Sequence, residues 1–426
     1  MKTKIVCLSI ISLFLLPCHA ASQSKHADVI TIDGVINPVV AEFITKSINR
    51  SVSEGAECLI IQMDTPGGLD LSMRSIIKEM MNADIPIVVY VSPGGARAAS
   101  AGAIITLAAD VAAMAPGTNI GAAHPVALGG GQMDDDMAAK VENDAAAYVE
   151  SIATKRKRNK EWAVKAVRES VSITEKEALN INVIDLIASD LNDLLSQIDG
   201  RDIQTAVGAK KLSTKNIALK YIEMDTREKI LDTLSNPNIA YILMLVGLVG
   251  LYFELSNPGA IFPGVIGGIS LILAFFAFQT LPVNYAGILL IILALILFIM
   301  EIKITSFGLL SIGGIISLTI GSLMLFDSPV PFLRVSLDVM IPVVTITSAC
   351  FILAIYLTIK AHRRKPTTGR EGLVGEKGVV RSKIDPKGKV FIHGEYWDAT
   401  SDEKIPEGTE VTVIEVNDIA IKVKQA

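Results

Sequence analysis

The residue of this chain best suited to chemistry is Ser100, which lies in the stretch 96–102, Ala-Arg-Ala-Ala-Ser-Ala-Gly. A serine hydroxyl becomes a nucleophile when a neighbouring base removes its proton. The small flanking side chains leave room for a peptide backbone, and the start of a predicted helix favours negative charge. This pattern is typical of a serine hydrolase, although an alanine-rich helix also accepts a serine for packing alone.

Two glycines upstream are candidates for binding the negative charge that such a reaction creates. Gly67 and Gly68 follow a predicted apolar strand at 59–63. Glycine adopts backbone angles closed to other residues, so successive N–H groups can point into one cleft, as an oxyanion hole requires. A plain strand-to-helix turn introduced by Pro66 would also explain them. The combination with Ser100 favours the oxyanion hole.

The base that Ser100 needs has two candidates downstream, His124 and Lys140. Either side chain can accept a proton in principle. A lysine does so only where burial or a nearby cation favours its neutral form. Lys140 is flanked by apolar residues at 137–139 and 141, which predicts such an environment, whereas most helical lysines are solvated.

The segments around these residues alternate between short apolar runs and longer amphipathic ones, which predicts an α/β domain with a buried sheet. A single cysteine within this domain, Cys58, lies in an apolar run and is predicted to be a core residue. The predicted strands are 29–32, 59–63, 87–91, 111–113 and 183–187, and the predicted helices are 39–52, 71–81, 99–108 and 137–155.

Four motifs, in order and spacing, resemble those of the membrane-bound ClpP-like serine proteases of the NfeD family, long form. The motifs are the stretches 64–68, 97–102, 115–122 and 140–153. The resemblance implies a ClpP/crotonase-like fold with Ser100 as nucleophile and Lys140 as base. It also implies an oxyanion hole made by the backbone amides of Gly67, Gly68 and Ala101, and a reaction that needs no metal or cofactor.

His124 remains an alternative base, because soluble ClpP peptidases carry the histidine of a Ser-His-Asp triad at a similar distance after the serine. In the alignment with those peptidases, however, Ser170 stands where the carboxylate partner of the histidine is expected. An imidazole without that orienting charge is a weaker base. The sequence therefore favours Lys140 over His124.

The N-terminus carries Lys2 and Lys4, an apolar run at 5–16 and small residues before Ala21. This order predicts a secretory signal peptide at 1–20, with an uncleaved membrane anchor as the alternative. Either one exports the following domain. At 50% hydrophobic residues, 19% charged residues and a net charge of −5, the chain is too apolar for an ordinary soluble enzyme and offers no broad basic face for nucleic acid.

Five apolar stretches at 239–255, 260–278, 285–300, 307–326 and 339–359 predict membrane helices. Five crossings would return an exported chain to the cytoplasm, and the basic run at 360–365 agrees with the positive-inside rule. A re-entrant third span would instead leave the tail outside. A second basic run at 155–158, Lys-Arg-Lys-Arg, is predicted to be a solvated helix end.

The C-terminal tail contains predicted strands at 378–383, 389–396, 410–416 and 419–424, separated by turn residues. This pattern predicts a small β-barrel and resembles the OB-fold module that ends NfeD proteins. The adjacent Tyr396 and Trp397 fit either a core or a surface for stacking bases. A docking role, toward a stomatin-like partner, is favoured over oligonucleotide binding.

The sequence thus predicts a signal peptide (1–20), an exported ClpP-like protease domain (21–200), a linker (201–235), a transmembrane region (236–361) and an OB-fold domain (366–426). We expect a multi-pass protein of the bacterial inner membrane, with the protease domain periplasmic and the barrel cytoplasmic. The family resemblance implies an endopeptidase that cleaves hydrophobic segments of a stomatin-like (SPFH) protein, that contacts membrane lipid and that forms homo-oligomers. The alternative is a catalytically weak scaffold for such partners.

Overall fold

A computed structural model describes residues 25–126, 134–256, 259, 261–304, 306–362, 370–417 and 420–426. The predicted signal at 1–20 and the basic residues at 363–365 lie outside the described residues. The chain divides into two units. One comprises residues up to 295 together with 314–344, and the other comprises 296–313 together with 345–426.

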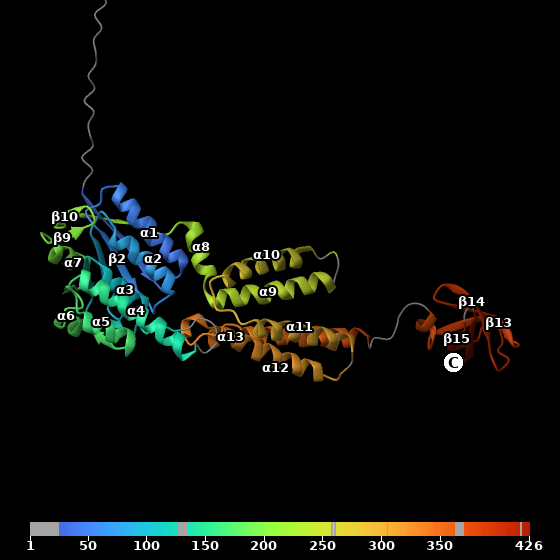
Figure 1. Cartoon of the computed structure of the whole chain (residues 1–426). Helices are drawn as coiled ribbons and strands as arrows, with labels where there is room; N and C mark the ends of the chain where they lie inside the picture. Colours follow the sequence, from blue (N-terminus) through green and yellow to red (C-terminus); the bar gives the residue numbers. More distant parts are fainter. Residues whose placement is uncertain are drawn as a thin grey trace, which may run out of the picture. The chain divides into compact units, whose positions relative to one another are not determined.

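The first unit is built on a parallel six-stranded sheet with the order β11-β1-β2-β3-β5-β8 (Figure 1). Residues 87–91 are buried throughout, as expected for a strand covered on both faces. The five predicted strands are all present. The six strands are β1 (His26–Asp33), β2 (Leu59–Asp64), β3 (Ile87–Val91), β5 (Val111–Met114), β8 (Leu186–Ile187) and β11 (Ala218–Tyr221).

Helices cover both faces of this sheet. The larger core packs α1 to α5 against one face, through residues such as Ile44, Ile76 and Ile105. A smaller core on the other face includes Leu194 and Ile198 of α7. The helices are α1 (Pro38–Ser53), α2 (Asp70–Met81), α3 (Ala101–Ala108), α4 (Asp135–Lys155), α5 (Lys160–Arg168), α6 (Glu175–Asn180), α7 (Leu191–Ile198) and α8 (Thr226–Leu234).

Short elements that the sequence pattern did not predict complete the domain. A three-stranded sheet of β4 (Arg97–Ala99), β6 (Asn119–Gly121) and β7 (Ser172–Thr174) stands beside the main sheet. The predicted linker at 201–235 contains the hairpin of β9 (Asp202–Thr205) and β10 (Gly208–Lys211), then β11 and α8. Because β11 pairs with β1, this stretch is structurally part of the α/β domain.

The prediction that the basic run at 155–158 is solvated is wrong for two of its four residues. Arg158 is 6% exposed and donates hydrogen bonds to the carbonyl oxygens of Leu107 (2.6 Å) and Ala109 (2.8 Å). It also pairs with Asp185 at 2.5 Å. Arg156 donates to the Ala108 carbonyl at 2.7 Å. Both guanidinium groups therefore satisfy the carbonyls at the C-terminal end of α3.

Replacing Arg158 with alanine is expected to destabilise the α/β domain by about 3 kcal/mol, because it removes the donor to the carbonyls of Leu107 and Ala109 and breaks the ion pair with Asp185. A domain of this size should then unfold about 6–12 °C lower. Thermal unfolding of the purified full-length protein, followed by the fluorescence of buried Trp162, measures the shift. Lys155→Ala, at the exposed C-terminal end of α4, is the control. Equal shifts for the two variants would contradict the capping role.

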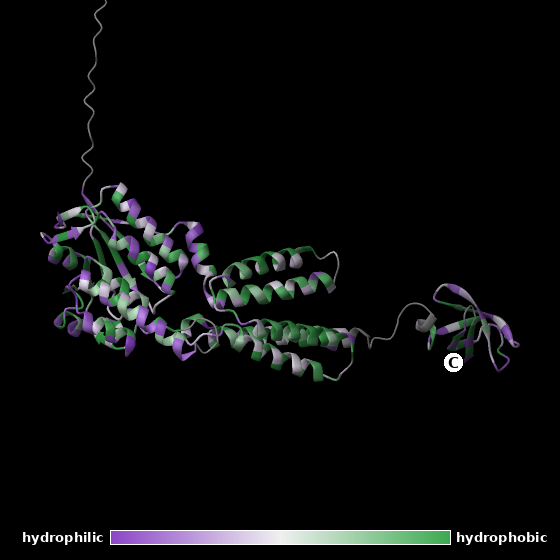
Figure 2. Ribbon diagram, in the orientation of Figure 1, coloured by the Kyte–Doolittle hydropathy of each residue, from purple (hydrophilic) through white to green (hydrophobic). Residues whose placement is uncertain are grey.

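The membrane region consists of helices built mostly from hydrophobic residues (Figure 2). Large apolar side chains are exposed along them, among them Ile272 at 70% and Leu289 at 66%. Such surfaces are stable against lipid but not against water. The helices are α9 (Pro237–Ser256), α10 (Ile261–Phe278), α11 (Tyr285–Lys303), α12 (Leu309–Met324) and α13 (Leu337–His362).

Of the five predicted spans, the described residues contain four that are long and apolar enough to cross a membrane: α9, α10, α11 and the stretch Pro331–Thr358. The fourth prediction was too long, because α12 has only 16 residues. Phe307 and Gly308 have φ values of 55° and 94°, which delays the start of this helix to Leu309. At its other end, Phe326 leaves the helix to bridge with Val283.

The second unit ends in a closed five-stranded barrel, consistent with the predicted OB-fold. The predicted strand 389–396 is in fact two strands, because His393 and Gly394 have φ values of 50° and 87° and form a two-residue hairpin turn. Trp397 packs against the barrel core, whereas Tyr396 is exposed. The strands are β12 (Lys377–Ser382), β13 (Lys387–Ile392), β14 (Glu395–Thr400), β15 (Glu410–Asn417) and β16 (Ala420–Gln425).

Candidate active site

Ser100 stands between β4 and α3 in a backbone conformation that L-amino acids rarely adopt, with φ 54° and ψ −117°. Its N–H donates to the carbonyl of Gly121 at 2.9 Å, and β4 is held by pairing with β6 and by a bridge between Thr65 and Ala98. A non-glycine residue with such angles is strained by about 1–3 kcal/mol and persists only where its surroundings impose it. Such strain is concentrated at functional sites.

Two glycines form the surface opposite Ser100. A Cβ atom on Gly67, which has φ +126°, would lie 2.7 Å from the Ser100 Cβ and 3.1 Å from its Oγ. A Cβ atom on Gly68 would lie 2.2 Å from the carbonyl oxygen of Ile36. Both positions therefore require glycine, because neither space can hold a methyl group. The backbone of this turn lies directly against the serine.

The N–H groups around Ser100 differ in what they bind. The Gly67 N–H already donates to Thr65 Oγ1 at 3.0 Å. Within the part of the chain that the structure describes, the N–H groups of Gly68 and Ala101 have no protein acceptor. Ala101 is the first residue of α3, where helix geometry leaves N–H groups unpaired. These two amides are the ones available to an oxyanion.

A pocket of about 610 Å³ brings most of the predicted site residues together. It is lined by Gly68, Ser100, Ala101, His124 and Lys140. Gly67 does not line the pocket but lies in contact with Ser100. Residues of α2, of α4 and of the segment 329–333 complete its wall. The arrangement combines a hydroxyl, two free amides and two possible bases around one space.

Lys140 extends from α4 and is exposed, as is Met137 at 52%. The apolar environment expected around this lysine is therefore not present in the single chain. The helix itself is well anchored, because Ala146, Val149 and Ile152 are buried. Lys140 thus projects from a fixed helix over an open part of the pocket.

A charged contact fixes α4 to α2 beside the pocket. Arg74 pairs with Asp144 at 2.5 Å and with Asp70 at 2.8 Å, and its guanidinium lies 4.4 Å from the centre of the Tyr148 ring. Asp144 follows Lys140 by one helical turn, so the contact holds the part of α4 that carries the lysine.

His124 is held by a neutral partner in place of a carboxylate. Its Nδ1 lies 2.9 Å from the carbonyl oxygen of Val167, which can only accept a hydrogen bond, so Nδ1 carries the hydrogen. Nε2 then keeps a lone pair and can accept a proton. Ser170, the residue predicted to replace the triad acid, lies in the connection between α5 and β7 with φ 54° and does not line the pocket.

Cys58 does not compete with Ser100, as its sequence context predicted. Its side chain is fully buried in β1–β2 packing, and burial raises the pKa of the thiol to about 12. A thiol in this state forms almost no thiolate at neutral pH, and the thiolate is the nucleophilic form.

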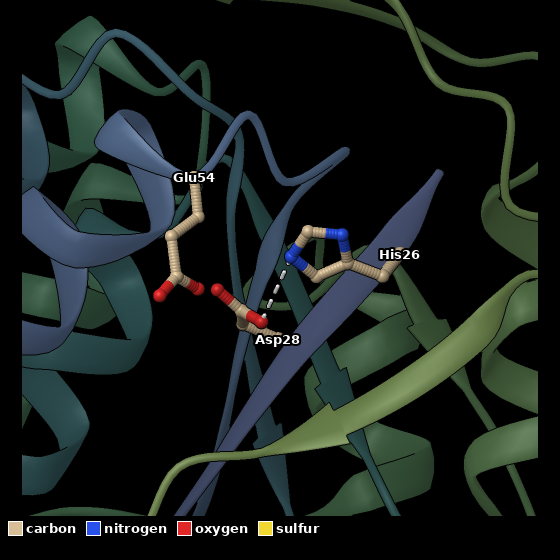
Figure 3. Close-up of side chains that lie close together, drawn as sticks. All are labelled: His26, Asp28 and Glu54. Atoms are coloured by element: carbon tan, nitrogen blue, oxygen red, sulfur yellow. Dashed lines mark ion pairs between the residues drawn. The ribbon is translucent and has the colours of Figure 1, made fainter. Parts of the chain in front are cut away.

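A second group of ionisable residues, His26, Asp28 and Glu54, lies at the N-terminal end of β1. Figure 3 shows their side chains close together. Their ligand atoms lie within 4.8 Å of one another, a separation that a metal could bridge. Both carboxylates already have protein partners. Asp28 accepts a hydrogen bond from the Ser51 hydroxyl at 2.6 Å, and Glu54 forms an ion pair with Lys220. The group ties β1, α1 and β11 together and is remote from Ser100.

Comparison with known proteins agrees with this division of the chain. Residues 26–206 match the N-terminal domain of NfeD1b, residues 238–357 match the NfeD integral membrane domain, and residues 370–425 match the NfeD-like C-terminal, partner-binding domain. The chain is 34% identical over 402 residues to the membrane-bound protease PH1510 of Pyrococcus horikoshii, covering 92% of this chain and 91% of that protein. It is 28% identical over 441 residues to the membrane protein NfeD1b of Bacillus subtilis, covering 98% and 96%.

Among solved structures, the chain is similar to the 1510-N membrane-bound stomatin-specific protease in complex with a substrate peptide, at 32% identity and a TM-score of 0.46. That match covers 50% of this chain and 98% of the other. A structure of the 1510-N protease from Pyrococcus horikoshii, described as specific for a stomatin homolog, matches at 30% identity and a TM-score of 0.44, covering 50% and 99%.

The chain has an α/β domain joined to helices that are apolar enough to cross a membrane, and it matches a membrane-bound protease over 91% of that protein's length. It is therefore a membrane-bound peptidase. The sequence identity to that protease and the matches of all three domains also establish the family of the chain. It belongs to the NfeD family.

Proposed function

We propose that the chain is a serine endopeptidase in which Ser100 attacks a peptide carbonyl and Lys140 accepts its proton. The amides of Gly68 and Ala101 bind the resulting oxyanion, and Gly67 allows the turn to approach the serine. Preorganised N–H groups at a developing negative charge are worth about 3–4 kcal/mol per donor. The N-terminus of α3 adds a favourable dipole at the same point.

The observation that carries this proposal is one shared pocket. Ser100, in a strained conformation, lines it together with Lys140 and the two amides that lack protein acceptors. Reaction requires a neutral amine, which a buried setting favours. Because Lys140 is exposed in the single chain, we propose that bound substrate or a second copy of the chain covers it.

The proposed substrate is a hydrophobic segment of a stomatin-like membrane protein. Support comes from the relative described as a stomatin-specific protease and from the match of residues 370–425 to a partner-binding domain. We further propose an inner-membrane location with the α/β domain periplasmic, contact with membrane lipid and assembly into homo-oligomers. The barrel would be cytoplasmic if α12 also crosses the membrane, and protease protection of a C-terminal tag tests this.

A serine-directed fluorophosphonate probe tests the proposed nucleophile. The full-length protein in detergent micelles should be labelled at Ser100, and Ser100→Ala should not be labelled. Ser196→Ala, a change on the exposed part of α7, is the matched control and should label like the wild type. If the wild-type protein is not labelled, and Ser100→Ala causes no loss of cellular function, the peptidase proposal is wrong and the scaffold alternative is favoured.

A further inference from the structure

One wall of the active-site pocket comes from the membrane region. Residues 329–333 line the same pocket as Ser100, Gly68 and Lys140. These five residues connect α12 to α13 and include the short 3-10 helix η1 (Pro331–Leu333). More than two hundred positions thus separate the nucleophile from this part of its own pocket.

The segment is held in a defined shape by its own hydrogen bonds. Ser328 is 1% exposed, and its Oγ accepts the N–H of Val330 at 3.1 Å. The Val330 carbonyl accepts the N–H of Leu333 at 3.1 Å, and Arg334 Nε donates to the Ser328 carbonyl. Leu333 is buried. The wall is therefore an ordered turn.

Contacts with the ends of other membrane helices fix this turn in place. The N–H of Ser336 donates to Asn238 Oδ1, at the start of α9, at 2.8 Å. The N–H of Asn284, before α11, donates to the Leu325 carbonyl at 2.8 Å. The wall is thus anchored to the ends of two further membrane helices.

The chemistry of the wall is apolar. Pro329 and Pro331 have no N–H, and the N–H groups of Val330 and Leu333 are already bonded within the turn. Four of the five residues in the segment therefore offer a substrate no N–H group for strand pairing. The segment contributes side chains instead, of which Phe332 is the largest and is half-buried.

The position of the wall relates the pocket to the bilayer. The candidate membrane span Pro331–Thr358 begins inside the segment 329–333, so the wall lies at the start of a stretch that is long and apolar enough to cross a bilayer. A peptide that contacts both Ser100 and this wall therefore lies next to the start of that apolar stretch.

We infer that Phe332 and its neighbours determine specificity, so that the pocket takes an extended substrate segment with apolar residues next to the scissile bond, located just outside the membrane. This inference rests on the proposed peptidase function of Ser100. Burying a phenylalanine-sized contact favours binding by an amount that corresponds to about a tenfold change in affinity or more.

A kinetic test uses the full-length protein in detergent micelles and a library of fluorescence-quenched decapeptides that vary at the four central positions. Phe332→Ala should raise KM for peptides with apolar centres about tenfold and broaden the preferred sequences, with kcat within about twofold of wild type. Phe332→Leu should be intermediate. Phe262→Ala is the matched control, because Phe262 is 77% exposed at the start of α10 and does not line the pocket.

A second measurement does not depend on turnover. In Ser100→Ala, p-benzoylphenylalanine at position 332 should crosslink apolar decapeptides on illumination, and the same group at position 262 should not. Equal crosslinking at the two positions, or unchanged KM and preference in Phe332→Ala, overturns the inference while Ser100 labelling stands. Loss of the proposed function itself is recognised separately, because the fluorophosphonate probe would then fail to label the wild type.

Discussion

Replacing Lys140 with methionine is expected to lower kcat for peptide cleavage by about 10²–10⁴-fold, the range that a general base contributes. Methionine keeps the length and apolar stem of lysine but cannot accept a proton. Because Lys140 is exposed and its removal leaves no buried group unpaired, the folded state should be unaffected. Steady-state cleavage of quenched peptides by the full-length protein measures the effect, and unchanged thermal unfolding confirms that the loss is chemical.

Two further variants separate the alternative bases. His124→Gln should retain activity within about threefold if the lysine is the base, whereas it should lose about 10²-fold or more if the imidazole Nε2 takes the proton. Lys155→Met, on the exposed end of the same helix, controls for the loss of a positive charge on α4. Full activity in Lys140→Met together with inactivity in His124→Gln would reverse the proposed assignment.

The sequence predicts much of the α/β domain because the local pattern and the tertiary fold agree there. The apolar runs at 59–63 and 87–91 are short and rich in β-branched residues, which favours buried strands, and they form β2 and β3. Small residues around Ser100 likewise indicate close approach, and Gly102 is needed because a Cβ there would lie 2.4 Å from Thr65 Cγ2. These signals are local, so a single sequence contains them.

Features that depend on distant contacts are not visible in the sequence. The Gly67 N–H is occupied because the turn places Thr65 Oγ1 beside it, which only the folded backbone determines. Arg158 is buried because the turn between α4 and α5 lies against the end of α3, although its neighbours in sequence are charged. Phe332 joins the pocket through the folding of the membrane region, and nothing near Ser100 in the sequence indicates it.

The setting of Lys140 was predicted incorrectly for a related reason. Apolar neighbours along a helix lie all around its circumference, so adjacent alanines do not bury a lysine. In the structure the buried positions of α4 lie further along the helix, at Ala146, Val149 and Ile152. The environment that makes this amine a base must therefore come from outside the helix. Substrate binding and assembly of chains are the two events that could provide it.

Replacing Gly67 with alanine is expected to lower kcat/KM by about 10²-fold or more, a second large effect, because the new methyl group would occupy space that Ser100 now fills. The added Cβ would lie 2.7 Å from the Ser100 Cβ, and the backbone at this position has φ +126°. A displacement of the nucleophile by about 1 Å is sufficient for a loss of this size. Peptide cleavage and the rate of fluorophosphonate labelling should fall together, since both require the same Oγ.

Gly34→Ala separates the loss of space from backbone strain. Gly34 has almost the same conformation, φ +128°, but nothing lies within 4 Å of a Cβ placed there. Gly34→Ala should lose about 1–2 kcal/mol of folding stability through the unfavourable φ, and Gly67→Ala should lose at least as much, as measured by thermal unfolding. Only Gly67→Ala should also lose labelling and cleavage. If the two variants lose activity equally, the contact between this turn and Ser100 is not what sets the position of the nucleophile, and the requirement for glycine at position 67 is one of backbone conformation alone.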